Sequence, residues 1–105
     1  MNKILERLDS TIQQKIAESP YNSHTAKLLK RGPEKCAEKF GEEAIELIVA
    51  CVKKKKKEII GEAADALYHM LVLLRSKNIS INEVLSELAS REGISGIEEK
   101  RKRNL

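Results

Sequence analysis

The sequence predicts an all-α domain whose core is completed by a second copy of the chain. Apolar residues make up 41% of the 105 residues and aromatic residues only 3%, so the core must be built from aliphatic side chains. Packed helices suit this composition better than a small β-sandwich does, and no segment shows the period-two alternation of a strand. The length fits one domain. We expect it to span residues 1–105, with a short basic tail from about residue 93.

The first half of the chain contains three expected helices. Apolar residues at helical spacing predict a helix over residues 2–18, which ends where Pro20 disfavours helical geometry in the residue before it. A short helix is expected over residues 23–30, stopped by Gly32. A long helix then begins at a proline, which is well tolerated in a first helical turn, and runs over residues 33–52.

The second half contains two more expected helices. The lysine run over residues 53–57 is interpreted as a solvated loop or a frayed helix end. A second long helix is expected over residues 58–76. Ser80 and Glu83 form a capping-box pattern, which predicts a last helix that ends at about Arg91.

The helix expected over residues 58–76 carries an acidic stripe on a largely apolar segment. At about 100° per residue, its acidic groups and one histidine fall within about 60° of one another. These residues are Glu58, Glu62, Asp65 and His69. A helix that is hydrophobic nearly all round is buried, so the stripe is expected to line a cleft or an interface. One small domain cannot cover so much apolar surface, and we therefore expect a homodimer.

The helix expected over residues 33–52 is more ambiguous. Its predicted core face comprises Phe40, Ala44, Leu47, Ile48 and Cys51. Glu42, Glu43 and Glu46 lie to one side of that face together with lysines. Because Lys39 precedes Glu43 by four residues, a salt-bridged surface is the plain alternative to a binding site.

The two acidic helices can bring their carboxylates together if they pack antiparallel, as a short connection favours. Carboxylates gathered near apolar surface repel one another and lose hydration. A hard cation with oxygen ligands would relieve both effects, so Mg²⁺ is the expected cofactor, with phosphate oxygens of a substrate completing its shell. Alternatives remain open: His69 and Tyr68 as ordinary core residues, or the acids as salt-bridge partners in a helical interaction module.

Charge and cysteine content narrow the remaining function classes. The net charge is +4 and the pI is near 9.1, with the excess in the lysine run and in the tail over residues 100–103. Basic residues interleaved with aromatic ones would indicate nucleic-acid binding, and the sequence does not contain such a pattern. Cys36 and Cys51 lie about 22 Å apart if one helix holds both, too far for a disulfide, so both are expected as reduced core thiols. Without a signal peptide or an apolar spanning run, we expect a cytoplasmic protein without membrane contact.

Longer motifs make the sequence similar to known proteins. Glu43-x-x-Glu46 followed by Glu62-x-x-Asp65 resembles the signature of the MazG-like, all-α nucleotide pyrophosphatases. Four segments narrow the resemblance to the phosphoribosyl-ATP pyrophosphohydrolase family: Thr25-Ala26-Lys27-Leu28, Lys39-Phe40-Gly41-Glu42-Glu43-Ala44-x-Glu46, Glu62-Ala63-Ala64-Asp65-x-Leu67-Tyr68-His69 and Gly96-Ile97-Glu98-Glu99-Lys100. The resemblance covers about Asp9 to Arg103. The lysine-rich loop departs from the family, and we expect a stand-alone hydrolase without a cyclohydrolase-like segment.

The resemblance implies a MazG-like bundle of about four to five helices, completed by dimerisation. It implies hydrolysis of phosphoribosyl-ATP to phosphoribosyl-AMP and pyrophosphate, the second step of histidine biosynthesis, with Mg²⁺. The implied metal ligands are Glu43, Glu46, Glu62 and Asp65; Glu42 is a further ligand or orients the water; Lys27, Lys39, Tyr68 and His69 contact the substrate. A house-cleaning nucleoside triphosphate pyrophosphatase of the same superfamily is the alternative.

Overall fold

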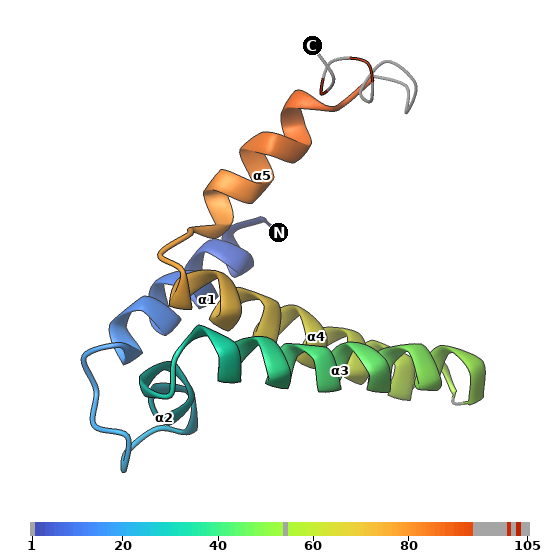
Figure 1. Cartoon of the computed structure of the whole chain (residues 1–105). Coiled ribbons are helices and arrows are strands. Elements are labelled where there is room, and N and C mark those ends of the chain that lie inside the picture. The colour runs from blue at the N-terminus through green and yellow to red at the C-terminus, as the bar shows by residue number, and fades with distance from the viewer. Residues whose placement is uncertain (1, 54, 94–100, 102, 104–105) are drawn as a thin grey trace.

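The computed structural model describes residues 2–53, 55–93, 101 and 103, and these residues contain five helices (Figure 1). The helices are α1 (Asn2–Lys15), α2 (His24–Lys30), α3 (Pro33–Lys53), α4 (Lys56–Ser76) and α5 (Ile81–Ser90). No strand occurs in the described part of the chain, so the predicted all-α class is confirmed. None of these helices is long and apolar enough to cross a bilayer. The tail expected from about residue 93 lies almost wholly outside the described residues.

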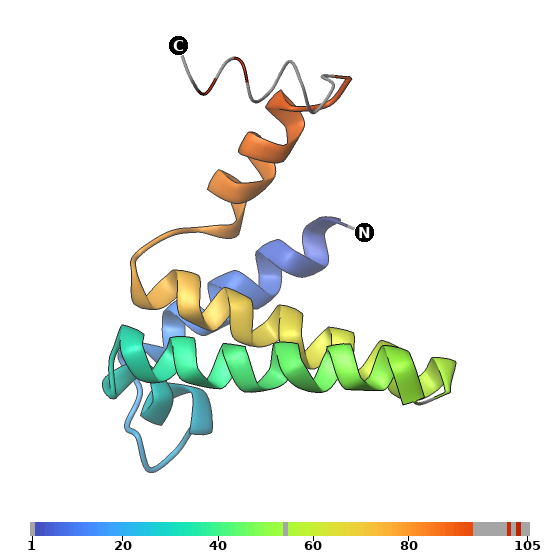
Figure 2. The same cartoon turned by 45° about the vertical axis from the view of Figure 1, so that its right-hand side comes forward.

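The two long helices form an antiparallel hairpin. In both views α3 and α4 lie side by side along their whole length (Figures 1 and 2). α1 packs across the C-terminal half of α4, and α2 lies near the start of α3, while α5 projects away from the hairpin. The hairpin therefore brings the two acidic segments of the sequence into the same region, as its short connection predicted.

Side-chain caps define the starts of α2 and α5. The Ser23 hydroxyl accepts a hydrogen bond of 3.1 Å from the Ala26 amide at the start of α2. At α5 the predicted capping box is confirmed, because the Ser80 amide donates to the Glu83 carboxylate over 2.8 Å and the Glu83 amide donates to the Ser80 hydroxyl over 3.3 Å. These bonds satisfy amides that have no partner within their own helix.

The connection between α3 and α4 is shorter than the lysine run over residues 53–57. The Glu58 carboxylate accepts a hydrogen bond of 3.1 Å from the Lys55 amide, so α4 begins at Lys56, and α3 continues through Lys53. Of the two interpretations of this run, a loop over all of residues 53–57 is therefore wrong, and a frayed helix end stays a prediction; Lys54 lies outside the described residues.

α1 is also shorter than the expected range of residues 2–18, since it ends at Lys15. The next three amides donate to carbonyls three residues earlier, beginning with Ile16 to Gln13 over 3.3 Å. This tighter hydrogen-bond pattern closes the helix before Pro20 is reached.

The core lies where α1, α3, α4 and α5 meet. Its buried residues are Ile12, Cys36, Leu71, Val72 and Ile81. A largely buried ion pair joins α1 to α4: Asp9, only 4% exposed, accepts hydrogen bonds of 2.7 and 2.9 Å from the Arg75 guanidinium. Its second oxygen also accepts the Ile81 amide over 2.9 Å, which anchors the start of α5.

The far half of the hairpin exposes a large apolar surface in the single chain. Its exposed apolar side chains are Ile45, Ile48, Val49, Val52 and Ile60. Ile48 is 63% exposed and Cys51 is also exposed, so assigning these two residues to the core was wrong for one chain. This half of α3 packs only on α4, and no other described helix covers its outer face.

Candidate functional site

Three carboxylates from α3 and α4 meet near the middle of the hairpin. Glu43, Glu62 and Asp65 each offer one oxygen, and these atoms all lie within 4.8 Å of one another. We call these residues the acidic cluster. Glu62 and Asp65 share a face because they are three residues apart on α4, and the antiparallel packing of α3 adds Glu43. Glu43 is buried, Glu62 is half-buried and Asp65 is exposed, so the cluster opens to solvent on one side.

The acidic cluster has an unsatisfied oxygen. Glu62 Oε2 is buried and has no hydrogen-bond partner among the described residues, and neither has His69 Nδ1. Buried polar atoms in folded proteins nearly always have partners, so this carboxylate oxygen is available to a ligand from outside the described residues. Carboxylate oxygens on a cleft that is partly open are the donors that Mg²⁺ prefers. The donor set therefore fits the expected ion.

The other two predicted acids lie beside the cluster. Glu46 follows Glu43 by less than one turn of α3, but its oxygens are not within the 4.8 Å group. The negative charge of Glu43 raises the pKa of Glu46 above its ordinary value. Glu46 is exposed. Glu42 is exposed as well, and its carboxylate lies 4.0 Å from the Lys39 ammonium.

Lys39 forms the ion pair that the sequence suggested. Lys39 lies one turn before Glu43 on α3, and its ammonium is 3.1 Å from the Glu43 carboxylate. The hydrogen bond from this ammonium is the main reason why the pKa of Glu43 lies below its ordinary value, and the same bond raises the pKa of Lys39. The salt-bridged surface and the acidic cluster are thus not alternatives, because Glu43 belongs to both.

Tyr68 and His69 connect the cluster to α2. The Tyr68 hydroxyl shares a hydrogen bond of 2.6 Å with the Thr25 hydroxyl, which fixes the start of α2 against α4. The Tyr68 ring meets the His69 ring edge to face, with centroids 5.4 Å apart. Burial lowers the pKa of His69, which favours the neutral imidazole. Both residues lie on α4, about one helical turn after Asp65.

Known proteins match this chain over nearly its full length. The family model of phosphoribosyl-ATP pyrophosphohydrolase matches residues 5–92. The chain belongs to this family. A phosphoribosyl-ATP pyrophosphatase of Dinoroseobacter shibae is 54% identical over 100 residues, covering 95% of this chain and 98% of that protein. The protein of the same name from Paracoccus denitrificans is 54% identical over 99 residues, covering 94% and 92%. The family identified from its motifs is confirmed.

A basic cavity beside the acidic cluster was not anticipated from the family's acidic motifs. It has a volume of about 230 Å³ between α2 and the first turns of α3. Of the two lysines predicted to bind substrate, Lys39 lines this cavity and Lys27 does not, since Lys27 is exposed elsewhere on α2. His24, Arg31 and Lys35 were missed. Their spacing could have indicated a shared basic surface, because His24 and Arg31 lie two helical turns apart and Lys35 precedes Lys39 by one turn.

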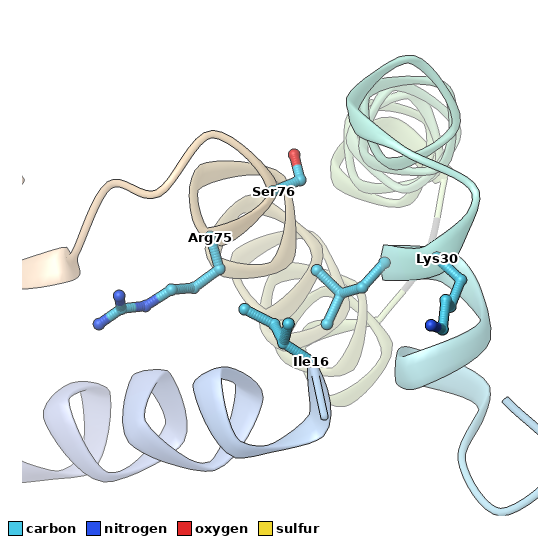
Figure 3. A pocket seen from close by; sticks show the side chains of 5 residues that line it. Ile16, Lys30, Arg75 and Ser76 are labelled. Carbon is cyan, nitrogen blue, oxygen red and sulfur yellow. The ribbon is translucent and has the colours of Figure 1, made fainter. Parts of the chain in front are cut away.

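A second hollow of about 310 Å³ lies away from the acidic cluster, between α1, α2 and α4. Ile16, just after the end of α1, and Lys30 of α2 line it, whereas the Arg75 side chain extends away from Lys30 (Figure 3). The Arg75 guanidinium is engaged by Asp9. This hollow therefore lacks a free cation from α4 and contains none of the predicted site residues.

Proposed function

We propose that this family member hydrolyses phosphoribosyl-ATP to phosphoribosyl-AMP and pyrophosphate, the second step of histidine biosynthesis, with Mg²⁺ as cofactor. The observation that carries the proposal is the family match over residues 5–92, supported by relatives at about half identity that bear this activity in their names. The acidic cluster supports the chemistry, because it supplies oxygen ligands next to a basic cavity. We place the enzyme in the cytoplasm, where its two free cysteines would stay reduced.

The ligands of the ion would be Glu43, Glu62 and Asp65, with Glu46 as the fourth. The orphaned oxygen of Glu62 supports this assignment. A bound Mg²⁺ ion supplies positive charge that offsets charge on the phosphoryl group, and it lowers the pKa of a coordinated water. Glu42, exposed at the edge of the cluster, is assigned to a further ligand position or to orienting the attacking water.

The substrate's charge and shape would be met by other residues of the chain. Lys39 lies between the cluster and the basic cavity, where its ammonium can donate to phosphate oxygens. Lys27, which is exposed on α2, is assigned to the substrate as well. Tyr68 is oriented by Thr25, and the neutral imidazole of His69 has Nδ1 available. We assign these two side chains to positioning the substrate beside the cluster.

We further propose that the enzyme is a homodimer joined through the far half of the hairpin. The apolar side chains exposed there include Val52, which is 79% exposed. The radius of gyration is 15.9 Å, whereas a compact domain of this length has about 13 Å. Contiguous exposed apolar surface of this kind is uncommon in monomers and marks an interaction surface. A second copy would bury the same residues of both chains.

The proposed function is tested by measuring the products released from phosphoribosyl-ATP with Mg²⁺ and with excess chelator. We expect pyrophosphate, not orthophosphate, and only when Mg²⁺ is present. The matched variants are Glu62→Gln, which should lose nearly all turnover, and Glu6→Gln, an exposed glutamate on α1 that should retain it. Orthophosphate as first product, or turnover in chelator, would contradict the proposal. Faster hydrolysis of common nucleoside triphosphates would favour the house-cleaning alternative.

A further inference from the structure

The basic cavity next to the acidic cluster has the composition of a phosphate site. Basic side chains predominate among the residues that line it: His24, Leu28, Arg31, Lys35, Glu38, Lys39 and Glu42. Lys35 pairs with Glu38 over 3.2 Å. Arg31, at the end of α2, has no carboxylate partner among the described residues. Arginine presents a fork of donors that matches phosphate oxygens.

One side chain belongs to both the cavity and the acidic cluster. Lys39 lines the cavity, yet its ammonium lies 3.1 Å from the carboxylate of Glu43, the buried member of the cluster. It is therefore the counter-ion of Glu43 in this structure. Its side chain is 36% exposed, and a lysine stem is flexible, so the ammonium can leave Glu43 without a backbone change.

A divalent cation and the Lys39 ammonium compete for the same carboxylate. An ion that binds Glu43, Glu62 and Asp65 carries twice the charge of the ammonium, and the two cations repel each other at contact distance. A bound ion would therefore displace the Lys39 ammonium from the Glu43 carboxylate. The open space next to it is the basic cavity, where an anion would provide a new partner for the ammonium.

The helices that bear the two sites are fixed relative to each other. The hydrogen bond of 2.6 Å between Thr25 and Tyr68 joins the residue after His24 to the residue before His69. His24 and His69 are close enough for the charge of one to affect the other. The cavity thus stays beside the cluster while the Lys39 side chain moves.

We propose that Lys39 is a movable counter-ion that couples divalent-cation binding to phosphate binding. It neutralises Glu43 when the acidic cluster holds no ion. It turns into the cavity formed with Arg31 and Lys35, and there binds a phosphate group, when an ion takes Glu43. The proposal rests on the proposed function in that the phosphate is a substrate group, although the coupling itself needs only a phosphate anion.

The coupling has a thermodynamic consequence in both directions. Mg²⁺ should increase the affinity for phosphate, and phosphate should increase the affinity for Mg²⁺ by the same factor. Removal of the Lys39 charge should have an opposite effect on each ligand. Mg²⁺ alone should bind more tightly because its competitor is gone, while phosphate should lose an ammonium that Mg²⁺ had released.

Titration calorimetry on the full chain tests this proposal. Mg²⁺ is titrated alone and with inorganic phosphate, and phosphate is titrated with and without saturating Mg²⁺. Lys39→Met is compared with Lys35→Met, which removes the same charge one turn earlier on α3 from a lysine paired with Glu38 instead of Glu43. In the wild type we expect Mg²⁺ to tighten phosphate binding at least about fivefold.

The two variants should separate in the titration of Mg²⁺ alone. Lys39→Met should bind Mg²⁺ several times more tightly than wild type and lose most of the coupling. Lys35→Met should keep the wild-type Mg²⁺ affinity and weaken phosphate equally in both conditions. Unchanged Mg²⁺ affinity in Lys39→Met, or tightening of similar size in both variants, would overturn the proposal. Because no nucleotide is used, failure of the proposed function on phosphoribosyl-ATP would be seen in a separate assay and would leave this result standing.

Discussion

Repulsion within the acidic cluster predicts that one charge-removing substitution stabilises the metal-free protein while it abolishes activity. Glu62→Gln keeps the side-chain shape and removes the charge of a carboxylate whose oxygen lies within 4.8 Å of the Glu43 oxygen. At that separation, repulsion is about 0.9 kcal/mol in water-like surroundings and about 3.5 kcal/mol at an effective dielectric constant of about 20. Lys39 neutralises part of the Glu43 charge, so we adopt about 1 kcal/mol.

A gain of about 1 kcal/mol corresponds to a rise in Tm of about 4–8 °C for a domain near this size. Added Mg²⁺ should stabilise the wild type more than the Glu62→Gln variant. At a concentration about 100 times its Kd, an ion that binds only the folded state stabilises by about 2.7 kcal/mol. Wild type should gain this stability, and Glu62→Gln should gain much less because one of its ligands is lost.

Thermal melts with Mg²⁺ and with chelator measure both effects. The control is Glu6→Gln, which changes the net charge equally but lies on α1, outside the acidic cluster. Its response to Mg²⁺ should match that of wild type. If Glu62→Gln instead melts below wild type in chelator, and Mg²⁺ shifts neither protein, the carboxylates act as structural partners and the reasoning from repulsion is refuted.

Three further predictions concern pH, the buried ion pair and the apolar surface. The pKa of His69 is lowered from its ordinary value of 6.5, so the unfolded chain takes up a proton at a higher pH than the folded protein does. The free energy of unfolding should therefore fall as the pH drops below 6.5. In urea titrations, His69→Gln should show a smaller fall over the same pH range. Asp9→Asn leaves the half-buried Arg75 guanidinium without its carboxylate and should lower the free energy of unfolding by about 3 kcal/mol. A loss under about 1 kcal/mol would contradict this account. Ile48→Glu, on the exposed apolar surface, should convert a dimer to a monomer in light scattering, and a wild-type monomer would contradict the proposed dimer.

The sequence by itself determined the elements and the family. Apolar spacing, the turn at Pro20 and the capping box of Ser80 and Glu83 are local signals, so the helices they predict agree with the structure to within about three residues. The acid pairs on α3 and α4 also follow from local spacing, because residues three or four apart share a helix face. The short connection between these helices was enough to expect an antiparallel hairpin.

The tertiary structure decided which of these residues meet. Asp9 reads as an ordinary surface residue in sequence, and its burial depends on Arg75 and Ile81, which are distant in the chain. Periodicity placed Ile48 in the core, but a helical face is buried only if another element covers it, and none of the described helices covers this one. The basic cavity likewise arises because α2 lies beside the first turns of α3. Local spacing determines the direction of a side chain along its own helix; the packing of distant segments determines what it contacts.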